Sequence, residues 1–123
     1  MKSEGRQNIL SSFANAWRGI SHAIIKERNF KIHIFFAAAA ILVCVIFPVD
    51  GFHRFMVMYA IFFVLCTELI NTAVEAAVDL HSGQNIHPFA KIAKDCCAGA
   101  VLLASVQAII VAIIVAKHIL INL

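Results

Sequence analysis

The hydrophobic pattern divides most of this chain into three long apolar runs. They cover residues 30–47, 55–80 and 93–118, with turn signals at 48–51 and 81–88 between them. A helix needs about 20 mainly apolar residues to cross the hydrocarbon core of a bilayer, and as few as about 17 can suffice. Each run therefore predicts a membrane-spanning helix. The first two are joined so tightly that they must form an antiparallel hairpin.

A different pattern precedes the first run. Between residues 8 and 26 the large apolar side chains recur at steps of three and four, which is the spacing of one helical face. They are Leu10, Phe13, Trp17, Ile20 and Ile24. Polar residues occupy the other faces, so the segment predicts an amphipathic helix on the membrane surface, with Trp17 at headgroup level. A soluble helix that binds a partner protein is the alternative.

The second apolar run carries polar side chains at intervals of three, four and four: Glu68, Asn71, Glu75 and Asp79. On a helix that turns about 100° per residue they fall within roughly 80° of one another and form one polar stripe. Carboxylates and amides are costly inside a membrane and usually face a site or a polar cavity. In the third run, Gln107 is expected to hydrogen-bond to another helix. The stripe predicts a functional site; the alternative is a polar seam that only joins helices.

The composition excludes a soluble domain. The 123 residues are 62% hydrophobic and 14% charged, with a mean hydropathy of +0.89. A soluble chain this small cannot bury so much apolar surface. We expect an all-α integral membrane protein with a single unit over residues 1–123, without a nucleic-acid partner. No secretory signal is expected, because about thirty polar or amphipathic residues come before the first long apolar run.

The basic residues predict the orientation in the membrane. Those before the first run, or between the second and third, are Lys2, Arg6, Arg18, Lys26, Arg28, Lys31, Lys91 and Lys94. The first loop has only Arg54 and the tail only Lys117. Because cytoplasmic loops carry the excess of Lys and Arg, we expect the N-terminus and the second loop in the cytoplasm. The Glu75 and Asp79 end of the stripe then lies where nucleotides are available.

The charged residues at this end have the chemistry of phosphoryl transfer. Glu27 and Glu75 come from different elements and can share Mg²⁺, which typically takes one or two carboxylates plus phosphate oxygens. Lys94 can neutralise phosphate charge and Asn71 can position an oxygen. Glu68 lies about 10 Å deeper along the helix than Glu75 and suits a general base for a hydroxyl held in the membrane. The set fits transfer of a phosphoryl group from a water-soluble donor to a lipid alcohol.

The spacing alone leaves other functions open. The chain contains neither a Walker sequence nor the Gly-rich loop of protein kinases, so any nucleotide site is built differently. A small proton-coupled transporter would use Glu68 as its carrier site and would need neither Glu27 nor Lys94. A purely structural or interaction protein would tolerate the loss of the Glu68 and Glu75 carboxylates.

Two parts of the sequence carry a resemblance to a known family. The motif Glu68-x-x-Asn-x-x-x-Glu-x-x-x-Asp79, with Lys94-Asp95 downstream, resembles the prokaryotic diacylglycerol kinase family. Residues 27–33 and 87–95 are more similar to its undecaprenol kinase branch. The resemblance covers nearly the whole chain. It implies three-span subunits with a surface helix, assembled in the bacterial plasma membrane as a homotrimer with composite sites between neighbouring subunits.

The resemblance also implies roles for individual residues. Glu68 matches the catalytic base, and Glu27 with Glu75 matches the metal-binding carboxylates. The residues that contact nucleotide or line the site are Asn71, Asp79, His87, Lys94 and Asp95. The implied co-substrate is ATP, the cofactor is Mg²⁺, and the lipid alcohol is undecaprenol, with diacylglycerol as the runner-up. Some members have an arginine early in the surface helix, where this chain has Asn8 with Arg6 nearby.

Overall fold

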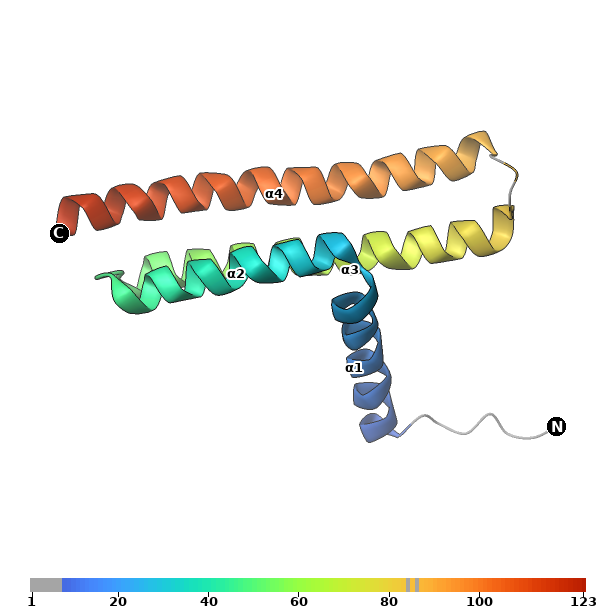
Figure 1. Ribbon diagram of the computed structural model, residues 1–123, viewed down its shortest axis with the longest axis horizontal. Helices are drawn as coiled ribbons and strands as arrows, with labels where there is room; N and C mark the ends of the chain where they lie inside the picture. Colours follow the sequence, from blue (N-terminus) through green and yellow to red (C-terminus); the bar gives the residue numbers. More distant parts are fainter. Residues whose placement is uncertain (1–7, 84, 86) are drawn as a thin grey trace.

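The computed structural model describes residues 8–83, 85 and 87–123. These residues form four α-helices: α1 (Ile9–Lys26), α2 (Arg28–Ile46), α3 (Gly51–Ser82) and α4 (Pro88–Asn122). Helices α2, α3 and α4 run lengthwise together, and α1 projects from the start of α2 at a steep angle (Figure 1). Asn8 immediately precedes α1, whereas Arg6 lies outside the described residues.

Helices α2, α3 and α4 are long and apolar enough to cross a membrane. Few of their side chains are buried within the single chain: 6%, 28% and 17% of the most apolar window in each. Apolar surface left this open has to be covered by lipid or by other chains, because its exposure to water is unfavourable. The predicted all-α membrane fold, with three spans and an N-terminal helix, is confirmed.

A cluster of buried apolar side chains lies where the end of α2, the start of α3 and the end of α4 meet. Its buried members are Cys44, Val49, Val57, Ala60, Val111, Val115 and Ile119. Ala40 and Ala108 pack against this cluster. Small side chains allow helix backbones to approach closely, and van der Waals packing is the main attraction between helices in lipid. This end of the bundle is held together by apolar contacts, and the polar stripe lies toward the other end of α3.

The two ends of α3 are set by capping residues. Asp50 caps the N-terminus, since its Oδ1 accepts a hydrogen bond of 2.9 Å from the His53 backbone N–H. That bond, with a second contact from the His53 ring, lowers the pKa of the Asp50 carboxyl. The cap explains why α3 begins at Gly51, ahead of its apolar run. Gly83 follows α3 with a φ of 58°, a conformation that glycine adopts without steric cost.

Glu27 forms the corner between α1 and α2. Its backbone is extended, with φ −94° and ψ 115°, so the helix is interrupted there. Ala23, 0% exposed, and Phe30, 2% exposed, are buried on either side of the break. This buried pair fixes the corner, and the Glu27 carboxylate is therefore held at the start of α2.

Candidate functional site

The polar stripe of α3 runs from the interior of the chain to its surface. Glu68 is 2% exposed and Asn71 is 7% exposed. Glu75 is half-buried and Asp79 is exposed. Because the spacing keeps all four on one helical face, they form a continuous polar path along α3. Such a path suits a site that meets a lipid-held group at one end and a water-soluble group at the other.

Only some of the polar atoms in the stripe are paired. The Asn71 Nδ2 group donates to Glu75 Oε1 at 3.3 Å. Glu68 Oε2 and Asn71 Oδ1 are buried and have no hydrogen-bond partner among residues 8–83, 85 and 87–123. Buried polar atoms in folded proteins are nearly always hydrogen-bonded. These two oxygens therefore have the capacity to accept hydrogen bonds from a substrate or from a neighbouring chain.

His33 of α2 is the residue near the site that sequence reasoning missed. Its position at the start of the first apolar run suggested an interfacial histidine. In the structure its Nε2 lies 3.9 Å from Glu68 Oε2, which is too long for a hydrogen bond but close enough for electrostatic contact. One sequence feature could have pointed to His33 as a site residue: it ends the 27–33 segment, which begins with Glu27.

Lys94 connects α4 to the stripe. Its Nζ donates to Asp79 Oδ1 at 2.5 Å, and the two side chains are 40% and 65% exposed. One turn earlier on α4, Lys91 Nζ donates to Asp95 Oδ2 at 2.6 Å. The structure thus brings Lys94 and Asp79 together, and it pairs Asp95 with Lys91. Exposed ion pairs of this kind are weak, so either can exchange its partner for a phosphate oxygen.

Glu27 contributes negative charge to the same region from another element. It is half-buried at the α1–α2 corner, and both α1 and α2 contact α3, which carries Glu68 and Glu75. A cation bound by carboxylates from two elements offsets their negative charge. Within the described ranges this end has no group of three metal-ligating side chains. Two carboxylates, with water and phosphate oxygens as the other ligands, is the pattern typical of Mg²⁺.

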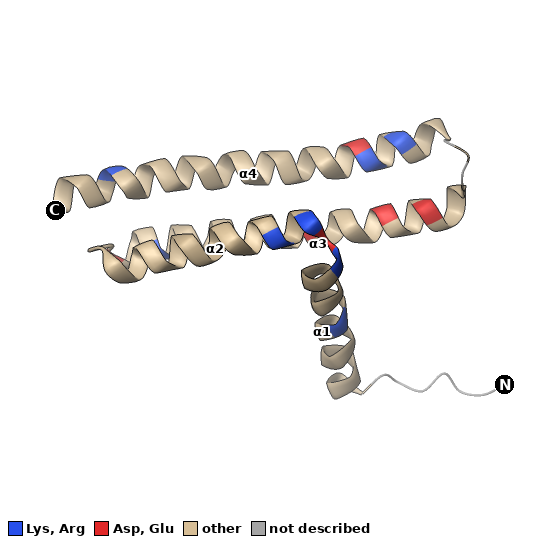
Figure 2. Ribbon diagram, in the orientation of Figure 1, with Lys and Arg blue, Asp and Glu red and all other residues tan. Residues whose placement is uncertain are grey.

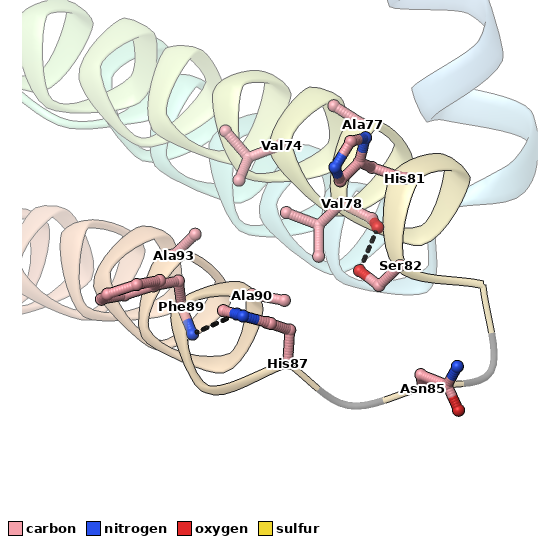
Figure 3. Close-up of a pocket in the computed structure, with 10 residues that line it drawn as sticks. All are labelled: Val74, Ala77, Val78, His81, Ser82, Asn85, His87, Phe89, Ala90 and Ala93. Carbon is pink, nitrogen blue, oxygen red and sulfur yellow. Dashed lines mark hydrogen bonds between the residues drawn. The ribbon is translucent and has the colours of Figure 1, made fainter.

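His87 lies apart from the carboxylates. Its Nδ1 accepts a 3.1 Å hydrogen bond from the Phe89 backbone N–H and caps α4. It lines a cavity of about 670 Å³ between the end of α3 and the start of α4, shown in Figure 3. Its other lining residues are Val74, Ala77, Val78, His81, Ser82, Asn85, Phe89, Ala90 and Ala93. Of the predicted site residues the cavity includes only His87, so the chain does not bring His87 to the stripe.

Charged residues gather along the chain at the α1–α2 corner, the end of α3 and the start of α4, as the blue and red ribbon segments of Figure 2 show. This charged end carries the family motif, and residues 14–116 match the model of the family described as prokaryotic diacylglycerol kinase. The chain belongs to the prokaryotic diacylglycerol kinase family. The family consists of membrane lipid kinases, so the predicted resemblance and enzyme class are confirmed. Kinase chemistry implies the use of ATP.

Curated relatives carry two different names. The diacylglycerol kinase of Synechocystis sp. is 45% identical over 104 residues, which are 85% of this chain and 59% of that protein. The undecaprenol kinase of Bacillus subtilis is 36% identical over 120 residues, covering 94% of this chain and 96% of the relative. The diacylglycerol kinase of Escherichia coli is 29% identical over 86% of both chains. The chain therefore spans little more than half of the cyanobacterial relative but nearly all of the Bacillus enzyme.

Proposed function

We propose that this protein transfers the γ-phosphoryl group of ATP to undecaprenol, giving undecaprenyl phosphate at the cytoplasmic face of a bacterial plasma membrane. The observation that carries the proposal is the α3 stripe. Its buried end is Glu68, which has an unpartnered oxygen among the described residues. Its surface end is Asp79, joined to Lys94 of α4. One helix face thus extends from the membrane depth at which a lipid hydroxyl lies to the surface at which a nucleotide binds.

Glu68 acts at the lipid hydroxyl. The hydroxyl proton passes to a Glu68 carboxylate oxygen while the hydroxyl oxygen forms a bond to the γ-phosphorus. The bond from the γ-phosphorus to its bridging oxygen breaks, and ADP leaves. Asn71 holds an oxygen of the reacting groups, and His33, 3.9 Å from Glu68 Oε2, adds a polar contact on the α2 side. Positioning and charge stabilisation supply most of the rate enhancement in this chemistry.

Glu27 and Glu75 fit a Mg²⁺ ion, because they are half-buried hard oxygen ligands from two elements that contact each other. When bound, the ion neutralises phosphate charge and orients the nucleotide. Lys94 supplies a second positive charge once a phosphate oxygen replaces its Asp79 partner. Asp95 and His87 contact the nucleotide from the start of α4, with Asp95 released from Lys91.

The lipid chain lies in an apolar groove between α2, α3 and α4. This groove has a volume of about 670 Å³ and includes His33, Phe36, Val64 and Leu65 among its lining residues. Because His33 is also next to Glu68, a chain seated there presents its hydroxyl end toward the stripe. The lipid then enters sideways from the bilayer and needs no water-filled pocket.

We further propose a homotrimer with sites shared between subunits. Two features support assembly. The spanning helices are mostly exposed apolar surface in the single chain. Gln107, expected to hydrogen-bond between helices, has a buried Oε1 without a partner in the part of the chain that the structure describes. A native mass measurement in detergent tests the trimer: a mass of one or two chains in active protein would refute it.

Undecaprenol is preferred because the Bacillus relative aligns along nearly its full length and because residues 27–33 and 87–95 resemble that branch. Diacylglycerol is the second candidate, since the more identical Synechocystis relative carries that name. The polar residues that act on the hydroxyl are the same for both, and apolar contacts to the lipid discriminate only weakly.

The experiment offers both lipids to the purified chain in bicelles with ATP and Mg²⁺ and measures phosphate transferred to each. Phosphorylation that favours undecaprenol supports the proposal. Phosphorylation that favours diacylglycerol keeps the mechanism and changes the substrate. No transfer to either lipid by folded protein overturns the kinase assignment and returns the transporter hypothesis, which predicts pH-dependent transport without ATP consumption.

A further inference from the structure

Three side chains with metal-ligand chemistry meet at the end of the bundle away from the polar stripe. Asp50 is the N-cap of α3, and His53 lies in the first turn of that helix. His118 comes from the end of α4. Figure 1 shows the α2–α3 turn and the C-terminal end of α4 at the same end of the molecule. None of the residues assigned to phosphoryl transfer belongs to this group.

The distances within the group are close to those of a metal site. His53 Nδ1 lies 3.0 Å and His118 Nε2 lies 3.5 Å from the same carboxylate oxygen, Asp50 Oδ2. One ligand atom from each of the three residues lies within 4.8 Å of the other two. Around a tetrahedral zinc ion with bonds of about 2.0–2.1 Å, neighbouring ligand atoms are about 3.3 Å apart. Two of the three separations therefore need little adjustment.

The two imidazole rings face one another across the α3–α4 contact. The His53 and His118 rings are stacked, with centroids 4.0 Å apart and planes at 23°. This arrangement holds both rings against the Asp50 carboxylate. The two histidine side chains are 18% and 20% exposed and Asp50 is 52% exposed, so an ion and a water ligand can reach them.

The surrounding cations leave the ligand atoms accessible. Arg54, the neighbour of His53 in sequence, directs its Nε to the Val49 carbonyl oxygen at 2.9 Å. Lys117 precedes His118 on α4, so its side chain leaves α4 about 100° around the helix axis from that of His118. Two imidazoles and one carboxylate form a ligand set that suits zinc and other first-row divalent ions, whereas Mg²⁺ prefers oxygen ligands alone.

We propose that Asp50, His53 and His118 bind one divalent transition-metal ion, with Zn²⁺ as the reference ion and water as the fourth ligand. The bound ion joins the start of α3 to the end of α4, next to the apolar core cluster. All three protein ligands come from a single chain, so the site needs neither the proposed trimer nor the proposed lipid kinase reaction.

The test titrates the purified full chain in detergent micelles with Co²⁺ and then Zn²⁺, in an excess of Mg²⁺ that occupies the carboxylates of the stripe. We expect one Co²⁺ per chain, with the visible absorption of nitrogen and oxygen ligation, displaced by Zn²⁺. His118→Gln and Asp50→Asn should each weaken Zn²⁺ binding at least about tenfold, the low end of the losses seen for supporting partners of metal ligands. Asparagine retains the helix cap, so Asp50→Asn isolates the ligand charge.

His22→Gln is the matched control, because His22 is an exposed histidine on α1. It should bind Zn²⁺ as the wild type does. Zinc should raise the unfolding temperature of the wild type and of His22→Gln but not of His118→Gln, since a ligand stabilises only a fold that binds it. The proposal is wrong if the folded wild type binds no Co²⁺, if the spectrum shows thiolate ligation by the cysteines, or if His118→Gln and Asp50→Asn keep wild-type affinity.

Discussion

Both ends of α3 carry polar side chains, but they differ in whether the side-chain oxygens have partners within the chain. At its start, Asp50 accepts from the His53 backbone and lies within 3.5 Å of His118, so its oxygens have partners inside the chain. In its second half, Glu68 and Asn71 are more deeply buried, yet each has an oxygen without a partner among the described residues. Polar groups that satisfy one another hold helices together, whereas unsatisfied buried groups are costly and are retained where a substrate uses them. The polar groups at the start of α3 join it to α4, a connection that the proposed metal ion would strengthen, whereas the stripe leaves buried oxygens available to a substrate.

The largest effect should come from removing the charge of the buried carboxylate. Glu68→Gln is expected to lower kcat about 10²- to 10⁴-fold, the usual contribution of a general acid–base group. Nucleotide binding should largely survive, because the role proposed for Glu68 is at the lipid hydroxyl. Initial rates with saturating undecaprenol, together with a nucleotide-binding titration, measure both quantities.

Thr67→Val is the matched control for that variant. Thr67 neighbours Glu68, but its Oγ1 donates to the Val64 carbonyl oxygen of its own helix at 2.9 Å, and it is not one of the four stripe residues. The variant should keep wild-type turnover. Equal activity in Glu68→Gln and Thr67→Val would remove Glu68 from the reaction.

The next effect concerns the carboxylates proposed to bind Mg²⁺, Glu27 and Glu75. Glu75→Gln should raise the apparent KM for Mg–ATP about 10- to 100-fold, since a contact to a charged group contributes about 1.5–3 kcal/mol. Rates measured over a range of Mg²⁺ concentrations separate this loss from a change in kcat. An unchanged KM at every Mg²⁺ concentration would contradict the assignment.

Two lysines on α4 sharpen the same assignment. Lys94→Met should weaken Mg–ATP binding about tenfold, because it removes the charge-assisted contact to phosphate that we propose for Lys94. Lys91 lies one turn earlier and pairs with Asp95, whereas Lys94 pairs with Asp79. Lys91→Met should therefore change Mg–ATP binding much less. KM values for ATP from both variants test the assignment of Lys94. An equal loss of ATP affinity in both variants would show only a general effect of positive charge.

The smallest effect compares the turns at the two ends of α3. Gly83→Ala should destabilise the protein by about 1–2 kcal/mol, because Gly83 has a φ of 58° that a side chain disfavours. Gly51→Ala should have little effect or a slight stabilising one, since Gly51 has ordinary helical backbone and open space at its Cβ position. Denaturant-induced unfolding of both variants in the same micelles measures the difference. Equal stabilities would mean that the α3–α4 turn relaxes without cost.

Much of the site was predictable because it lies on one helix. The 3-4-4 spacing fixes Glu68, Asn71, Glu75 and Asp79 on one face wherever the helix packs, and local geometry needs no knowledge of the fold. Contacts between helices were harder to predict from the sequence. The approach of His33 to Glu68 depends on how α2 rotates against α3, and an apolar run of alanine and phenylalanine gives few clues to that rotation.

The sequence by itself determined the membrane class, the three spans, the stripe and the family, because hydrophobic length and helical period act within a single segment. Only the tertiary structure decided that Lys94 of α4 pairs with Asp79 of α3. It also decided that His118 reaches Asp50 and His53 from the far end of α4. The physical reason is that side chains distant in sequence meet only through the packing and register of whole helices, which the small residues between α3 and α4 set collectively.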